Sequence, residues 1–174
     1  RISHAAIDME PLLAGIDDYV PQVARALEDL CARTGAAQAI LVGHSMGGLV
    51  ARAYLRTHGA ARIARVFTLG TPHHGTALAD AAPGINAVQM RRRAPGEASD
   101  NAWLRALADS ESPAIRALIT SIYTHHDNIV SPQTSSQLQG ACNYEFGGVG
   151  HVAMASNRRI LTCLMQEIAI VSTG

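Results

Sequence analysis

The spacing of apolar residues changes repeatedly along the chain, and each change predicts a new secondary-structure element. Apolar residues recur at helical spacing from Ile16 to Cys31, and Gly35 follows as a suitable end for that helix. Residues 38–42 are then almost entirely apolar, as in strands that are buried on both faces of a parallel sheet. The chain up to residue 42 therefore predicts a helix followed by a buried strand.

The same patterns predict the other elements. Further strands are expected at residues 4–8, 65–69, 120–123 and 143–146. A second helix is expected to carry Leu49, Val50, Ala53 and Tyr54 and to stop near Gly59; a last helix is expected to carry Ile160, Leu161, Leu164, Met165 and Ile168 on one face. Because strands alternate with helices, we expect an α/β fold: a mostly parallel sheet covered by helices on both faces, as a three-layer sandwich over residues 1–174 in one domain.

The pattern weakens between about residues 76 and 112. Gly, Pro, Asn and Ser are frequent there, and one helix-like piece surrounds Trp103, Leu104 and Leu107. Irregular segments of this length are often lids or binding segments, so we interpret 76–112 as a lid or cap.

Composition narrows the function. Hydrophobic residues make up 48% of the 174 residues, enough for a core, while Lys+Arg and Asp+Glu are balanced at 14 each. Aromatic residues make up only 4%, and the one basic run, residues 91–93, is interpreted as a solvated loop, so no nucleic-acid partner is expected. No apolar run is long enough for a transmembrane segment, and no signal peptide is visible.

The ends and the cysteines add two expectations. The chain begins at Arg1 rather than Met, so we expect a fragment, a processed form or an incomplete clone, and the compartment stays open. Cys31, Cys142 and Cys163 allow at most one disulfide and lack metal-ligand spacing, so unpaired thiols and no metal site are expected.

The sequence Gly43-His44-Ser45-Met46-Gly47-Gly48 follows the apolar strand directly. It fits a nucleophile elbow, a sharp strand-to-helix turn with a serine at its apex and small residues where side chains would clash. Ser45 is therefore the candidate nucleophile. The backbone N–H of Met46, at the start of the next helix, is the candidate donor to an oxyanion.

A serine nucleophile needs a histidine base and an orienting carboxylate. Two loops that follow late strands provide Asp127 and His151, at the sheet edge where parallel sheets place their active sites. The alternatives are that Asp127 only forms a turn with Asn128 and that His151 is structural. Other acids are less well placed: Asp80, Asp100 and Asp109.

With these motifs in order, the chain resembles the lipase/esterase branch of the α/β-hydrolases, in particular bacterial triacylglycerol lipases. The matching stretches are 43–48, 68–76, 123–132 and 150–151. The resemblance implies hydrolysis of carboxylic esters, of small molecules or lipids, through an acyl-serine intermediate and without a cofactor. It assigns the nucleophile, acid and base to Ser45, Asp127 and His151.

Several neighbouring residues are candidates for oxyanion or substrate binding: Met46, His44, Leu49 and Thr71. For Met46 and Leu49 core packing is an equal alternative, and for His44 a structural hydrogen bond. His73 and His74 are expected to shape the pocket floor, with a metal site as the minority alternative.

The chain departs from the family pattern at its start. The family's earlier strands, and the loop that provides a second oxyanion donor, would precede residue 1, and His58-Gly59 and His74-Gly75 come too late in the chain to replace that loop. We therefore expect a truncated chain with an exposed sheet edge, covered by a second copy or a rearranged N-terminal segment. The alternative functions are another acyl-transfer enzyme (a thioesterase or acyltransferase) and a catalytically impaired scaffold.

Overall fold

The computed structural model describes residues 2–92 and 101–173. Its strands are β1 (Ala39–His44), β2 (Ile63–Leu69), β3 (Ile119–Thr124) and β4 (Cys142–Phe146). They form one parallel sheet in the order β1-β2-β3-β4. The α-helices are α1 (Val20–Thr34), α2 (Met46–His58), α3 (Ile85–Met90), α4 (Ala102–Asp109), α5 (Pro113–Ala117) and α6 (Arg158–Thr173). The 3-10 helices are η1 (Ile16–Tyr19), η2 (Ala77–Ala81), η3 (Gln133–Ser136) and η4 (Val152–Ala155).

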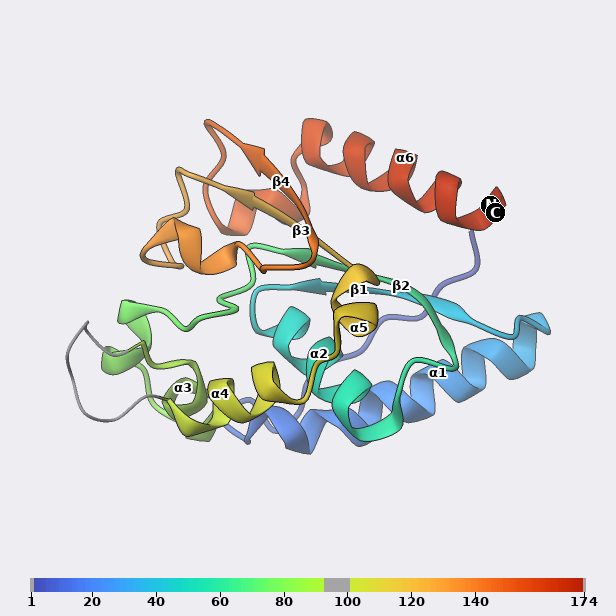
Figure 1. Cartoon of the computed structure of the whole chain (residues 1–174), viewed down its shortest axis with the longest axis horizontal. Helices are drawn as coiled ribbons and strands as arrows, with labels where there is room; N and C mark the ends of the chain where they lie inside the picture. The colour runs from blue at the N-terminus through green and yellow to red at the C-terminus, as the bar shows by residue number, and fades with distance from the viewer. Residues whose placement is uncertain (1, 93–100, 174) are drawn as a thin grey trace.

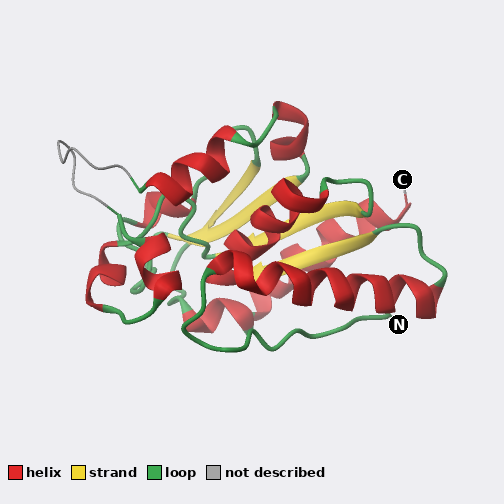
Figure 2. Cartoon of the chain, turned by 90° about the horizontal axis from the view of Figure 1, so that it is seen from below, coloured by secondary structure: helices red, strands yellow, loops and turns green. Residues whose placement is uncertain are grey.

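Helices cover both faces of this sheet (Figures 1 and 2). Helices α1 and α2 lie on one face and α6 on the other, which confirms the predicted three-layer α/β architecture. The larger apolar core lies on the α1 and α2 side and includes Leu49 and Val66. The smaller core joins Phe67 and Ile122 of the sheet to Ile160 of α6.

The first helix ends where the sequence predicts. Gly35 adopts a left-handed conformation (φ 73°), and its N–H donates to the Cys31 carbonyl at 2.8 Å. Glycine reaches this conformation without the steric cost that a Cβ imposes.

The strand predicted at residues 4–8 is wrong. That segment is a loop in the structure. Ile7 within it and Met9 just after it pack partly buried against the larger core. A short segment becomes a strand only where a neighbouring strand completes its hydrogen bonds, and this segment joins no ladder among the described residues.

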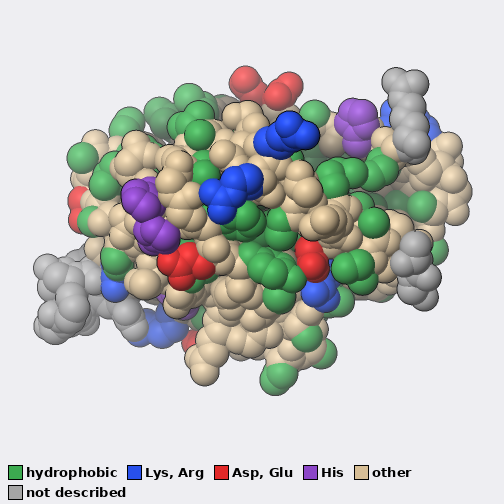
Figure 3. Space-filling view, turned by 90° about the horizontal axis from the view of Figure 1, so that it is seen from above, with side chains coloured by type: hydrophobic (Ala, Val, Ile, Leu, Met, Phe, Trp, Pro, Cys, Tyr) green, Lys and Arg blue, Asp and Glu red, His purple; other side chains and the backbone are tan. Residues whose placement is uncertain are grey.

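The apolar face predicted for α6 is partly wrong. Ile160 and Leu164 are buried and Ile168 packs beside them, whereas Leu161 and Met165 are exposed. The buried residues follow i, i+4, i+8, and each exposed one is a single position further on, about 100° around the helix. Hydrophobic side chains are visible among the polar surface on the upper side of the molecule, where α6 lies (Figure 3).

β1, the strand that carries the elbow, lies at one end of the sheet that the described residues form. Val42, within this strand, is half-exposed, which is unusual for an apolar residue in a parallel sheet. The second copy predicted to cover this side stays a prediction.

The segment at 76–112 contains more helix than the sequence indicates. The helix around Trp103 is confirmed as α4, which Asn101 caps by accepting from the N–H groups of Trp103 and Leu104. Helix α3 and η2 were not predicted. The Thr76 N–H donates to the Met90 carbonyl at 2.8 Å, which joins two parts of the segment. Residues 93–100, with Arg93 and Asp100, lie outside the described residues.

Candidate active site

Ser45 occupies the turn between β1 and α2 with a strained backbone, φ 54° and ψ −125°. Its N–H donates to the Leu69 carbonyl at 2.8 Å, and its own carbonyl accepts from Thr71 Oγ1 at 2.8 Å. A Cβ at Gly43 would lie 2.5 Å from the Gly48 nitrogen, and a Cβ at Gly48 would overlap Thr71 Oγ1. The turn therefore requires both glycines, as a nucleophile elbow does.

Asp127 and His151 form a buried hydrogen-bonded pair. His151 Nδ1 donates to Asp127 Oδ2 at 2.8 Å, and the two residues are 4% and 3% exposed. The other carboxylate oxygen accepts from the N–H groups of Ile129 and Val130, both at 2.8 Å. Asp127 thus forms a turn with one carboxylate oxygen and holds His151 with the other. Turn formation and contact with the histidine, which the sequence offered as alternatives, therefore both occur. With its proton on Nδ1, the imidazole keeps Nε2 as a free acceptor.

The elbow and the pair meet at the carboxyl end of β2. Gly70 follows this strand, and a Cβ built on it would lie 3.2 Å from both Asp127 Oδ2 and His151 Nδ1. The preceding residue, Leu69, accepts the hydrogen bond from Ser45. Residues far apart in sequence are therefore gathered around one corner of the sheet.

The backbone of His151 is held from two sides. Its N–H donates to Asn128 Oδ1 at 3.1 Å, and its carbonyl accepts from His44 Nε2 at 3.0 Å. The rings of His44 and His151 lie 4.8 Å apart. Burial lowers the pKa of His44, which favours the neutral ring. His44 therefore makes a structural hydrogen bond, which was the alternative interpretation to substrate binding. The hydrogen bond from the His151 N–H to Asn128 was not predicted.

The remaining candidate residues lie in the core, at the start of α2 and at the surface. Leu49 is fully buried in the larger core, which agrees with core packing, the alternative interpretation of this residue. Met46 is partly buried against the same core and begins α2, so its N–H has no partner one turn earlier in the helix. The rival acid Asp80 pairs at the surface with Arg91, and Asp109 ends α4.

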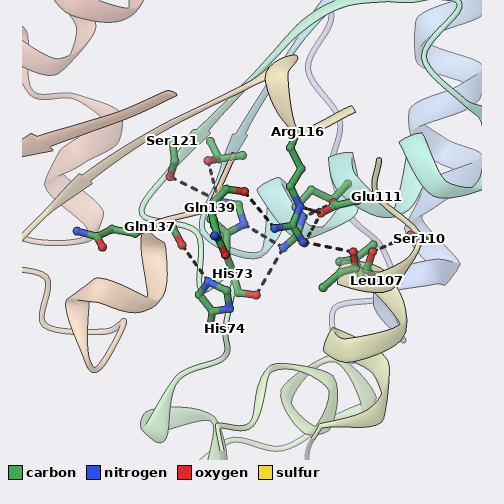
Figure 4. A network of polar contacts seen from close by, with 12 residues as sticks. His73, His74, Leu107, Ser110, Glu111, Arg116, Ser121, Gln137 and Gln139 are labelled. Atoms are coloured by element: carbon green, nitrogen blue, oxygen red, sulfur yellow. Dashed lines mark hydrogen bonds and ion pairs between the residues drawn. The ribbon is translucent and has the colours of Figure 1, made fainter. Parts of the chain in front are cut away.

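A second polar cluster lies under the loop that follows β2 (Figure 4). Arg52 of α2 is 1% exposed and donates from Nε and Nη2 to the two carboxylate oxygens of Glu111, at 2.6 and 2.8 Å. Its Nη1 donates to His73 Nδ1 at 3.2 Å. Arg116 adds a bond from Nε to Glu111 at 3.1 Å. We call these four residues the Arg52 cluster.

One feature of the sequence indicates that such a cluster exists. Arg52 interrupts the apolar stretch of α2, between Leu49 and Tyr54, where a charged side chain needs a buried partner. The partner, Glu111, is 59 residues away, and no local pattern identifies it.

Among residues 2–92 and 101–173, no group of three or more His, Cys, Asp or Glu side chains is arranged to hold a metal ion. In the same residues, no helix combines the length and apolarity needed to cross a membrane. Cys31, Cys142 and Cys163 are free thiols in this structure.

Comparisons with known proteins agree with the α/β fold of this chain. The family model described as "alpha/beta hydrolase fold" matches residues 9–102, more than half of the chain. Two triacylglycerol lipases, from Pseudarthrobacter phenanthrenivorans and Burkholderia plantarii, are each 41% identical over 59 residues. The matched part is 34% of this chain and only 18% and 16% of those proteins, so the chain matches less than a fifth of either relative.

Solved structures show the same fold at low identity. The mature lipase BlEst2 of Bacillus licheniformis is 19% identical with a TM-score of 0.67, and the match covers 83% of this chain and 70% of that one. Lipase B of Aspergillus fumigatus is 20% identical with a TM-score of 0.58, covering 77% and 34%.

Proposed function

Because the chain belongs to the alpha/beta hydrolase fold family, we propose that its site hydrolyses carboxylic esters, those of lipids included, with Ser45 as nucleophile. The observation that carries the proposal is the buried 2.8 Å hydrogen bond between His151 and Asp127 beside the strained elbow. The names of the two curated relatives, both triacylglycerol lipases, support an ester as the substrate class.

The proposed mechanism follows from the tautomer of His151. Asp127 holds the proton on Nδ1, which leaves Nε2 to take the Ser45 hydroxyl proton as the oxygen attacks the ester carbonyl. The negative charge of the carboxylate then stabilises the imidazolium. His151 returns the proton to the leaving alcohol. Water then attacks the acyl-serine while His151 takes its proton, and His151 gives that proton back to the Ser45 oxygen as the carboxylic acid is released.

On this mechanism the negative charge that develops on the carbonyl oxygen of the ester lies beside the first residues of α2. The N–H of Met46 and the helix dipole are the stabilising groups that the chain offers there. Thr71, which holds the Ser45 carbonyl, keeps this end of the elbow in place.

The test is hydrolysis of a short-chain and a long-chain p-nitrophenyl ester by the wild type and by Ser45→Ala, beside labelling with a fluorophosphonate and mass spectrometry of the labelled peptide. The proposal expects hydrolysis and labelling at Ser45 in the wild type and neither in the variant. A folded wild type that does neither would favour the impaired scaffold. A competing alcohol that diverts most of the acyl group into a new ester would favour an acyltransferase.

A further inference from the structure

The Arg52 cluster makes contact with the elbow through the loop after β2. From His73, the backbone N–H donates to the Thr71 carbonyl at 2.9 Å, and Thr71 Oγ1 donates to the Ser45 carbonyl. Thr71 is fully buried and lies against Gly48, in the first turn of α2. A continuous path of short contacts therefore leads from Glu111 through Arg52 and His73 to the residue that bears the strained backbone.

Arg52 also fixes the tautomer of His73. Since its Nη1 donates to Nδ1, the ring proton is on Nε2, which donates to Thr68 Oγ1 at 3.1 Å and faces Ser121 Oγ at 3.4 Å. Ser121 in turn donates to the Ser136 carbonyl at 2.7 Å, so its oxygen is free to accept. Both ring nitrogens are thereby satisfied, and the imidazole has one orientation.

Buried charges of this kind are not needed for stability alone, because apolar residues of similar volume often serve as well. Such a cluster does, however, have a single well-defined geometry, since every donor and acceptor in it is directional. A loop held by it is held in one position.

Resting on the proposed function, we infer that Arg52, Glu111 and His73 are positioning residues for ester hydrolysis, which fix Thr71 under the Ser45 carbonyl and so hold the elbow in its reactive geometry. None of them touches the substrate. Their link to turnover is the Arg52–His73 hydrogen bond, rather than the bond from His73 to Thr68.

Two substitutions of one residue separate these bonds. In His73→Asn the amide oxygen can stand near the position of Nδ1 and accept from Arg52, whereas in His73→Gln the amide nitrogen can stand near Nε2 and donate to Thr68. We expect His73→Asn to keep most of the wild-type kcat. We expect His73→Gln to lower kcat about 10- to 100-fold with KM unchanged, the size of effect that small misplacements of reacting groups produce.

The matched control is Arg56→Gln, one turn further along α2. Arg56 pairs with Asp17 at the surface and lies outside the path to Ser45, so this variant should keep the wild-type kcat. Equal kcat values for the Asn and Gln variants of His73, whether both high or both low, would overturn the inference.

A second substitution keeps the test decisive if His73→Gln does not fold. Thr71→Val removes the hydroxyl that reaches Ser45 and should lower kcat in the same range; in the His73→Asn background it should have the same effect as in the wild type. A wild-type kcat in Thr71→Val would overturn the inference. Fluorophosphonate labelling of the wild type distinguishes failure of the proposed function from failure of this inference. Absence of label at Ser45 contradicts the proposed function. Labelling at Ser45 together with unaltered kcat in the variants contradicts only the positioning role.

Discussion

Two buried histidines lie at the carboxyl side of this sheet, and they differ in what faces Nδ1. In His151 that nitrogen donates to the Asp127 carboxylate, and in His73 it accepts from the Arg52 guanidinium. A carboxylate stabilises the cation that forms when the ring takes a second proton, whereas a guanidinium disfavours it. The first arrangement suits a base that cycles between states, and the second suits a ring that stays neutral.

The comparison shows that burial and residue type do not determine the role of a histidine. Both side chains are almost fully buried, and both follow strands in glycine-containing loops. The charge of the group that holds Nδ1 is what separates a candidate base from a positioning residue.

The largest expected effect is at the carboxylate. Asp127→Asn should leave the turn to Ile129 and Val130 intact but remove the charge and the tautomer control on His151. We expect kcat to fall about 10⁴-fold, as for the corresponding change in a well-studied serine protease. Steady-state hydrolysis measures this, with the circular dichroism spectrum as the check on folding. A decrease in kcat of less than tenfold would mean that the contact with Asp127 rather than Arg52 is not what distinguishes the role of His151 from that of His73.

The next largest effect is expected on the free energy of unfolding, when the carboxylate that pairs with Arg52 beside His73 is removed. Glu111→Ala leaves the guanidinium of Arg52 buried without its carboxylate, and the free energy of unfolding should fall by about 3–5 kcal/mol. Urea unfolding at pH 7.5 measures the change. A loss below about 1 kcal/mol would show that Arg52 behaves as an exposed residue, against its burial.

The pH dependence of stability should come from the neutral histidine. Burial, and then the nearby charges of Arg52, His74 and Arg116, hold the pKa of His73 well below its ordinary value of 6.5. The unfolded chain takes up this proton below pH 6.5 and the folded chain does not, so stability is full above 6.5 and falls as the pH drops below it. The slope from one such proton is about 1.4 kcal/mol per pH unit.

Urea unfolding between pH 7.5 and 5 tests this with His73→Asn as the reference. The pKa values of His44 and His74 are also lowered by burial, so part of the slope should persist in the variant. The variant should be flatter than the wild type; parallel curves would refute the assignment to His73.

The smallest effect is expected at the surface pair of α2. Arg56→Gln breaks the ion pair with Asp17, whose side chain is 45% exposed, and should cost less than about 1 kcal/mol at low salt and less still at high salt. Thermal unfolding at two salt concentrations measures it. A cost as large as that of Glu111→Ala would remove the contrast between buried and exposed arginines on this helix.

The sequence was informative where structure and chemistry are local. The elbow around Ser45, and the strand-end loops with Asp127 and His151, each appear as a short pattern next to a recognisable strand. Glu111 could not be assigned, because its partner Arg52 comes from another element and only the fold brings them together. The strand predicted at residues 4–8 failed for the same reason, since a strand depends on a neighbour that its own sequence does not specify.

The strands lie in the sheet in the same order as in the chain, which bears on how the protein is made. Of these four strands, a ribosome delivers β1 before the other three, and each later strand can add to the edge already present. Ser45 then emerges long before Asp127 and His151, which come after β3 and β4. On the proposed mechanism, the nascent chain carries an unreactive serine until the loop after β4, with His151, has been synthesised.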